Sequence, residues 1–362
     1  MKVYILVLII VFILAAMVRG FDENELYYKS IKIKKNILVA YIFMTLSLLS
    51  GLRYGVGTDY FGYRKIFLKI NENNIESNRD WGYYLLNKLV INFSKNPQAI
   101  FLVTSFIINF FIIYTIYKYS KLFEVSIFLY ISTYMYFSSF NGIRQWIAAS
   151  ILFFGTKYLL ERKFLKYFII VFIASTFHQT ALIMLPVYFL VNHKFKSLKT
   201  IILILIGGVI FILYKPFTDL LMQLLEGTKF FNDYNETIGV SGNGANFLRV
   251  VVASIPVILS YIMYNSVNKS TDNKIDILIN LSLINCLFML LGTRHWIFAR
   301  FLMYFEPYNL ILYPLILIKF DKKNIKLIYY LLIVFYLLFC ILILKSGDSN
   351  IVPYRINLDL FR

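Results

Sequence analysis

Apolar residues fill most of the chain in long runs that short charged segments separate. The runs are roughly 16 to 22 residues long, close to the length of a helix that crosses a bilayer. A hydrophobic share of 59% also exceeds what a soluble domain can bury. We therefore predict an all-α integral membrane protein with a single polytopic domain over residues 1–362. Its 11 or 12 transmembrane helices are expected at about 3–18, 37–52, 99–117, 122–140, 144–160, 165–177, 179–191, 200–214, 247–264, 275–291, 297–318 and 326–344.

The stretch 165–191 is too short for two full spans and long for one. Basic loops lie at both of its ends, and His178 lies in its middle. This pattern favours a hairpin of two short helices with His178 at the tip. A single tilted helix is the alternative, and it would reverse the topology of everything that follows.

The distribution of lysine sets the orientation of the predicted spans. Alternate loops hold 17 of the 26 lysines, which by the positive-inside tendency makes those loops cytoplasmic. Loops 53–98 and 215–246 then lie outside, and the aromatic and basic mixture in 53–98 predicts helices in the membrane interface. The net charge of +18 is explained by these short loops and by anionic lipid, so we expect no nucleic-acid partner.

Arginine follows a different distribution from lysine. Only two of the 11 arginines, Arg19 and Arg162, lie in the cytoplasmic loops. The planar guanidinium is the better ligand for phosphate or carboxylate, so the outer arginines as a set predict an anion site. For a single arginine, a head-group contact or an ion pair with Asp or Glu is the alternative.

Several polar residues follow the second predicted span, in the stretch Gly51 to Phe67. Gly55 and Gly57 would let a substrate approach the backbone closely, although a tight turn explains them equally well. Asp59 is a candidate base or a partner for Arg53, and a helix N-cap is its structural alternative. Tyr60, Tyr63 and Trp81 are candidates for stacking on sugar rings; core packing or lipid contact is the alternative for each.

His178 is the best candidate for a general base, since a neutral imidazole accepts a proton near neutral pH. A histidine in an apolar run is more often a hydrogen-bonded packing residue, so that alternative stays open. Cys286 and Cys340 lie in apolar runs and have no metal-ligand spacing. There is also no DxD motif and no His/Cys cluster, so we expect neither a metal nor a cofactor.

Six motifs in this order resemble the EpsG-type branch of the Wzy polysaccharide polymerases over about residues 37 to 355. RYGVGTDY begins at Arg53, and Arg79-Asp80-Trp81-Gly82-Tyr83 follows it. The others are Asn141-Gly142-Ile143-Arg144-Gln145, Phe177-His178-Gln179-Thr180-Ala181 and Arg300-Phe301-Leu302-Met303-Tyr304-Phe305, with Pro353-Tyr354 near the end. Gln179 is a departure, because the family commonly has a basic residue or a different polar residue directly after this histidine.

The resemblance implies a GT-C-like bundle that joins undecaprenyl-pyrophosphate-linked oligosaccharide repeat units on the outer face of the bacterial plasma membrane. The product would be O-antigen, capsule or exopolysaccharide, and a flippase and a chain-length regulator would be pathway partners. Arg53 is the first candidate for the pyrophosphate, followed by Arg144, Arg300 and Arg294, with His178 or Asp59 as the base. A lipid-linked oligosaccharide flippase and an outer-face ligase are the alternative functions.

Overall fold

The computed structural model describes residues 1–20, 28–74, 80–224, 226, 244–267, 274–321 and 323–357. Within these ranges the chain is all-helical, about 80% helix, with one isolated bridge between Arg53 and Ile356 in place of any strand. The chain divides into two compact units, residues 1–188 with 313–362 and residues 189–312. Each unit is described by itself; a single domain for the whole chain stays a prediction.

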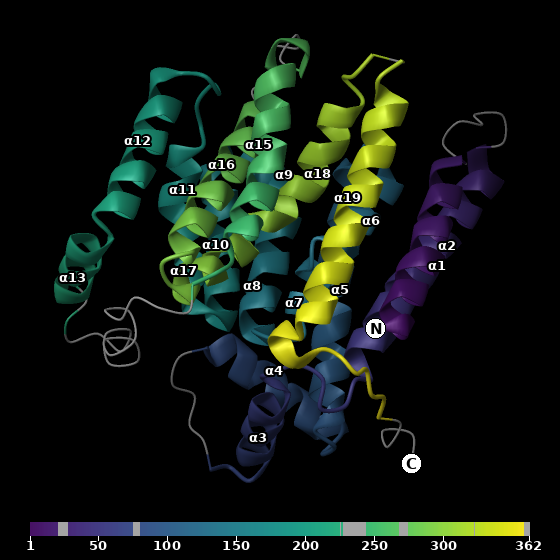
Figure 1. The fold of residues 1–362 in the computed structure, drawn as a ribbon. Coiled ribbons are helices and arrows are strands. Elements are labelled where there is room, and N and C mark those ends of the chain that lie inside the picture. The colour runs from purple at the N-terminus through teal and green to yellow at the C-terminus, as the bar shows by residue number, and fades with distance from the viewer. Residues whose placement is uncertain are drawn as a thin grey trace. The chain divides into compact units, whose positions relative to one another are not determined.

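The first unit contains the helices from the N-terminus to the middle of the chain and the last long helix (Figure 1). They are α1 (Lys2–Gly20), α2 (Tyr28–Gly51), α3 (Tyr60–Asn71), α4 (Trp81–Phe93), α5 (Gln98–Tyr119), α6 (Phe123–Ser132), α7 (Met135–Ser138), α8 (Ile143–Phe154), α9 (Thr156–Leu160), α10 (Phe164–Phe177), a 3-10 helix (Gln179–Ile183) and α19 (Ile325–Ser346). Helix α11 (Met184–Leu190) leads into the second unit and α18 (Glu306–Leu317) returns from it.

Six helices in the described residues are long and apolar enough to cross a membrane. They are Lys2–Gly20, Ile33–Gly51, Gln98–Tyr119, Phe247–Asn265, Lys274–Gly292 and Ile325–Ser346; the bent pair Leu198–Ile212 and Tyr214–Leu224 makes a seventh if it is one span. Several predicted runs are broken helices. Tyr134, for example, has a φ of 80° and divides the predicted span 122–140 into α6 and α7. About 12 spans and a GT-C-like fold therefore stay predictions.

The two ends of the first unit carry different chemistry. At one end, Tyr117 of α5 donates to Asn36 of α2 over 2.9 Å, and Lys35 lies over the Tyr117 ring. At the other end, Gln98 at the start of α5 donates to the Gly51 carbonyl over 2.6 Å. Helices α2 and α5 are thus antiparallel. The end with Lys35 is the one that the lysine pattern assigns to the cytoplasm.

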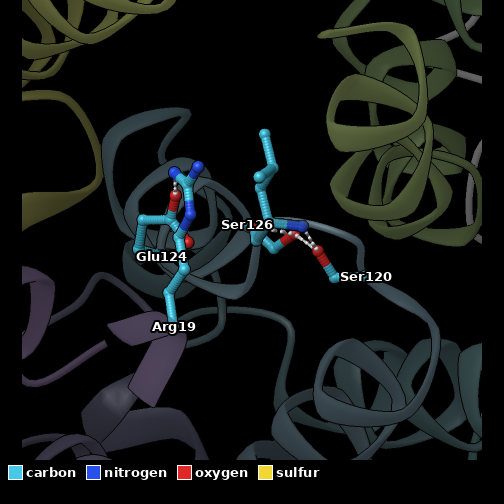
Figure 2. Close-up of polar contacts among 5 residues, drawn as sticks. Arg19, Ser120, Glu124 and Ser126 are labelled. Carbon is cyan, nitrogen blue, oxygen red and sulfur yellow. Dashed lines mark hydrogen bonds and ion pairs between the residues drawn. The ribbon is translucent and has the colours of Figure 1, made fainter. Parts of the chain in front are cut away.

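An ion pair between an exposed arginine and a buried carboxylate ties α1 to α6 at that lysine-rich end (Figure 2). Arg19 Nη1 lies 2.6 Å from Glu124 Oε1, and Glu124 is buried. Beside them, the Ser126 hydroxyl donates to the Ser120 hydroxyl over 2.6 Å. A buried carboxylate needs a cationic partner, so Arg19 satisfies a structural requirement here and is not available as part of an outer anion site.

The predicted hairpin around His178 is confirmed as a path of the backbone. Helix α10 ends at Phe177, and His178 has extended dihedral angles (φ −156°, ψ 115°). Beyond it, Tyr188 of α11 lies 5.3 Å from Phe164 and 5.5 Å from Tyr167 between ring centroids, so the chain returns to the start of α10. His178 is at the tip of this hairpin. Whether the two short limbs cross the bilayer stays a prediction.

The second unit consists of α12 (Leu198–Ile212), α13 (Tyr214–Leu224), α15 (Phe247–Val267), α16 (Lys274–Gly292), α17 (Trp296–Arg300), a 3-10 helix (Phe301–Tyr304) and most of α18. Buried Asp276 of α16 accepts from the Phe195 amide (2.9 Å) and the Tyr264 hydroxyl (2.8 Å). One turn later, Asn280 donates to the carbonyls of Val191 and His193. These bonds hold the loop before α12 on α16.

Candidate functional site

Arg53 is buried in the first unit, with 1% of its surface exposed. Its guanidinium donates to the backbone carbonyls of Ser50, Val56 (3.3 Å) and Phe140 (3.1 Å). It also lies over the ring of Phe101, at 5.1 Å from the centroid, and over the ring of Phe140 at 4.8 Å. Burial lowers the pKa of Arg53 to about 10, so the group stays charged at neutral pH. This geometry is that of a cation that fixes the loop after α2.

The segment after α19 lies along the loop after α2 and forms backbone hydrogen bonds with it. The Tyr4 hydroxyl donates to the Ile351 carbonyl over 2.8 Å, and the Tyr354 hydroxyl donates to the Leu49 carbonyl over 2.9 Å. The backbone bonds run from Tyr54 N to Arg355 O (2.9 Å), from Gly57 N to Asn350 O (2.9 Å), from Thr58 N to Ser349 O (3.2 Å) and from Asn357 N to Leu52 O (2.7 Å). The stretch Gly51 to Phe67 is therefore held by residues about 300 positions away.

Asp59 and Gly57 contact the turn that precedes α8. The Asp59 carboxylate accepts from the Gly142 amide over 2.8 Å, and the Asp59 amide donates to Asn141 Oδ1 over 3.1 Å. Gly57 has a φ of +98°, and a Cβ there would lie 2.7 Å from Asn141 Oδ1. Asp59 stands at the N-cap position of α3 without capping it. A tight turn and a close contact with Asn141 therefore account for glycine at position 57. The bond to the Gly142 amide accounts for the carboxylate of Asp59.

Arg144, Asp80 and His178 come together from three separate segments. Arg144 Nη1 donates to Asp80 Oδ2 over 2.6 Å, and His178 Nδ1 lies 3.6 Å from the same oxygen. The Asp80 carboxylate is buried, whereas Arg144 and His178 are partly exposed. A cation and an imidazole that reach the surface thus share one buried carboxylate. We call this group the Arg–Asp–His cluster.

Local structure positions each member of the cluster. Arg144 is in the first turn of α8, Asp80 directly precedes α4, and His178 follows the end of α10. Helix α4 approaches α10 very closely at Gly82, where a Cβ would lie 2.3 Å from Thr176 Oγ1. Because Gly82 is two residues after Asp80 and Thr176 is two before His178, this contact fixes the separation of the carboxylate and the imidazole.

The tyrosines of loop 53–98 are mostly structural. Tyr60 is buried, stacks on Phe101 with 4.4 Å between centroids and donates to Gln98 over 2.8 Å. Tyr63 is buried and interacts electrostatically with Arg144. Neither ring faces solvent for stacking on a sugar. Trp81, by contrast, is about half exposed.

The remaining predicted residues are Gly55, Arg294 and Arg300. Gly55 has a φ of +62°, a conformation that favours glycine in the turn after Arg53. Arg294 and Arg300 belong to the second unit, where their guanidinium carbons lie over the rings of Phe211 (4.5 Å) and Trp296 (4.7 Å). Their predicted role in binding pyrophosphate stays a prediction.

Asp80 is a member of the cluster that was not among the predicted site residues. The signal was present, since the motif Arg79-Asp80-Trp81-Gly82-Tyr83 places an acidic residue directly before an amphipathic helix. Its two partners could not be read from the sequence, because Arg144 and His178 are 64 and 98 positions further along the chain. Arg79 itself lies outside the described residues.

The fold defines a helical membrane protein, and the cluster brings a guanidinium, a carboxylate and an imidazole together at one end of its first unit. The profile of the EpsG family matches residues 36–356, nearly the whole chain. The chain therefore belongs to the EpsG family, the family of Wzy-type polysaccharide polymerases. No curated protein and no solved structure matches it. Family membership indicates a membrane polymerase of the glycosyltransferase type.

Proposed function

We propose that this protein joins undecaprenyl-pyrophosphate-linked oligosaccharide repeat units at the outer face of the plasma membrane and that the Arg–Asp–His cluster is its catalytic centre. Family membership supports polymerisation in general. The observation that carries the site is the shared contact of Arg144 and His178 with Asp80 Oδ2. The product is a surface polysaccharide such as O-antigen, capsule or exopolysaccharide.

In the proposed reaction, an acceptor sugar hydroxyl attacks the anomeric carbon of the donor sugar. The new glycosidic bond forms while the bond from that carbon to the lipid pyrophosphate breaks, and the electron pair leaves on the phosphate oxygen. His178 takes the hydroxyl proton through Nε2. Arg144 stabilises the negative charge that develops on the leaving group. Attack on the face opposite the leaving group inverts the anomeric configuration.

Asp80 has two successive partners in this mechanism. Without substrate, its Oδ2 is bonded to Arg144 at 2.6 Å, and His178 Nδ1 is 3.6 Å away, slightly too far for a hydrogen bond. A pyrophosphate that binds Arg144 competes with Asp80 for the guanidinium. The released carboxylate oxygen then accepts from His178 Nδ1–H and directs Nε2 at the acceptor. Catalytic hydrogen bonds are often long without substrate and shorten when it binds.

Arg53 and Asp59 have supporting roles in this proposal. Arg53 is engaged by three carbonyls and Asp59 by the Gly142 amide, two residues before Arg144. Both therefore help to hold the start of α8 and the cluster. The position of the cluster supports an outer-face reaction, since it lies at the end of the first unit opposite Lys35 and Arg19.

The test is complementation of a strain that lacks the gene with variants of the cluster. Arg144→Gln, Asp80→Asn and His178→Gln, expressed at the wild-type level, are expected to leave single repeat units on the surface. Arg64→Gln is the matched control, because Arg64 is an exposed arginine of α3 in the same outer region. It is expected to give a normal polymer ladder on a gel.

Two outcomes would contradict the proposal. A normal ladder from His178→Gln and Arg144→Gln would exclude the cluster as the catalytic centre. Accumulation of lipid-linked units on the cytoplasmic face in the deletion strain, in place of surface-exposed single units, would indicate a flippase.

A further inference from the structure

Helix α4 exposes a continuous apolar stripe. Trp81, Leu85, Leu89 and Phe93 recur every fourth residue and so lie along one face of the helix. Each is between 49% and 90% exposed. The opposite face of α4 carries the buried residues Gly82, Tyr83, Asn87 and Val90. Within the described part of the first unit, the stripe thus has little protein to cover it.

The two ends of the stripe lie beside different structures. Trp81 directly follows Asp80, whose carboxylate is bonded to Arg144. At the other end, Phe93 is five residues before Gln98, where the membrane-capable helix α5 begins. With a rise of 1.5 Å per residue, the stripe is about 18 Å long. It therefore runs from the cation of the cluster toward the start of the membrane-capable helix α5.

Helix α3, which packs on α4, exposes one large apolar side chain, Phe61, together with several cations. Its exposed positions include Arg64, Lys65 and Lys69. An interfacial helix with exposed cations is what anionic head groups favour. Other helices, such as α10 and α19, also expose apolar side chains. The stripe on α4 is aligned with the cluster, since Trp81 directly follows Asp80.

We propose that the stripe binds the apolar chain of the lipid-linked substrate while the phosphate of the same molecule contacts Arg144. The proposal rests on the proposed function, which makes that lipid the substrate. The arrangement of one cation at the head of a single-helix apolar track matches a phosphate with one long chain. A bulk phospholipid needs no such cation at a fixed end of the track.

The experiment uses the full-length protein in nanodiscs of phosphatidylethanolamine and phosphatidylglycerol. The probe is a long-chain polyprenyl phosphate with a photoreactive diazirine in its chain. After illumination, the label is expected on α4 at the stripe, and excess unlabelled polyprenyl phosphate is expected to remove it. Leu85→Ala/Leu89→Ala is expected to lower the labelling about tenfold, because each truncation removes apolar contact with the chain.

The matched control is Leu331→Ala/Leu338→Ala on α19, two leucines that are 58% and 56% exposed. This variant is expected to leave the labelling of α4 unchanged. Arg144→Gln, which retains the stripe, is expected to lower it as well, because the head group loses its cation. Labelling of α4 that unlabelled polyprenyl phosphate does not displace would overturn the proposal and indicate bilayer lipid on the stripe.

A kinetic arm separates this inference from the proposed function. With lipid-linked repeat units on a long or a short prenyl chain, Leu85→Ala/Leu89→Ala is expected to raise KM about tenfold for the long chain alone. An equal loss for both chains would overturn the inference. Displaceable labelling of α4 in a wild-type protein that makes no polymer would contradict the proposed function and still support the lipid site.

Discussion

Gly82→Ala tests the geometry of the cluster without changing any of its members. The new Cβ would lie 2.3 Å from Thr176 Oγ1, 3.0 Å from Thr176 Cβ and 3.1 Å from its carbonyl carbon. The hydroxyl also donates to the Ile173 carbonyl over 2.7 Å, so it does not rotate away without losing that bond. The backbone carbon is part of α10. We therefore expect α4 and α10 to separate at this point.

The magnitude follows from these distances. An ordinary contact of a Cβ is at least 3.4 Å, so the two carbon contacts require a few tenths of an ångström and the contact with Thr176 Oγ1 requires about 1 Å. Overpacking of this kind costs about 1–3 kcal/mol of stability, and alanine in place of glycine in a helix returns about 1 kcal/mol. Stability should thus fall by about 0–2 kcal/mol. A shift near 1 Å between Asp80 and His178 is instead expected to lower the polymerisation rate about 100-fold.

The assay combines thermal unfolding with the rate of polymer formation from purified lipid-linked units. Gly62→Ala is the control, since a Cβ at Gly62 of α3 has nothing within 4 Å; wild-type activity and equal or slightly higher stability are expected. Thr176→Ala removes the shortest clash, so the double variant Gly82→Ala/Thr176→Ala should regain part of the lost rate. A wild-type rate in Gly82→Ala, or a double variant no faster than the single one, would refute the reasoning.

Two further predictions concern a buried cation and a histidine. Arg53→Lys is expected to lower the free energy of unfolding by about 2–4 kcal/mol, since one ammonium does not reach three carbonyls and a buried charge loses partners; thermal unfolding measures this, and an unchanged midpoint would contradict a structural role. Burial, with Lys199 adding to it, lowers the pKa of His193. Folding therefore favours the neutral imidazole, and stability should decline as pH falls below about 6.5 through the lower folded-state pKa. His193→Gln should flatten that decline in unfolding experiments between about pH 5 and 8, and an unchanged slope would contradict the assignment.

The sequence by itself determined that the protein is a helical membrane protein and which end of the first unit is rich in lysine. Runs of apolar residues near the length of a bilayer crossing specify long helices, because a chain in lipid must satisfy its backbone bonds within each segment. The lysine pattern separated the two ends of the first unit, and Lys35 and Gln98 lie at opposite ends as that pattern requires. The position of His178 at the tip of a hairpin was also predictable, since it follows from run length and flanking charge.

Only the tertiary structure decided what each polar residue of the site contacts. The resemblance made Arg53 the first candidate for the pyrophosphate, yet its guanidinium is enclosed by carbonyls and rings from distant segments. Asp80 gains its importance from Arg144 and His178, and the close approach at Gly82 depends on how α4 packs on α10. Hydrophobic periodicity is local and can be read along the chain. The partner of a buried charge is set by packing between segments far apart in sequence, and no local pattern encodes it.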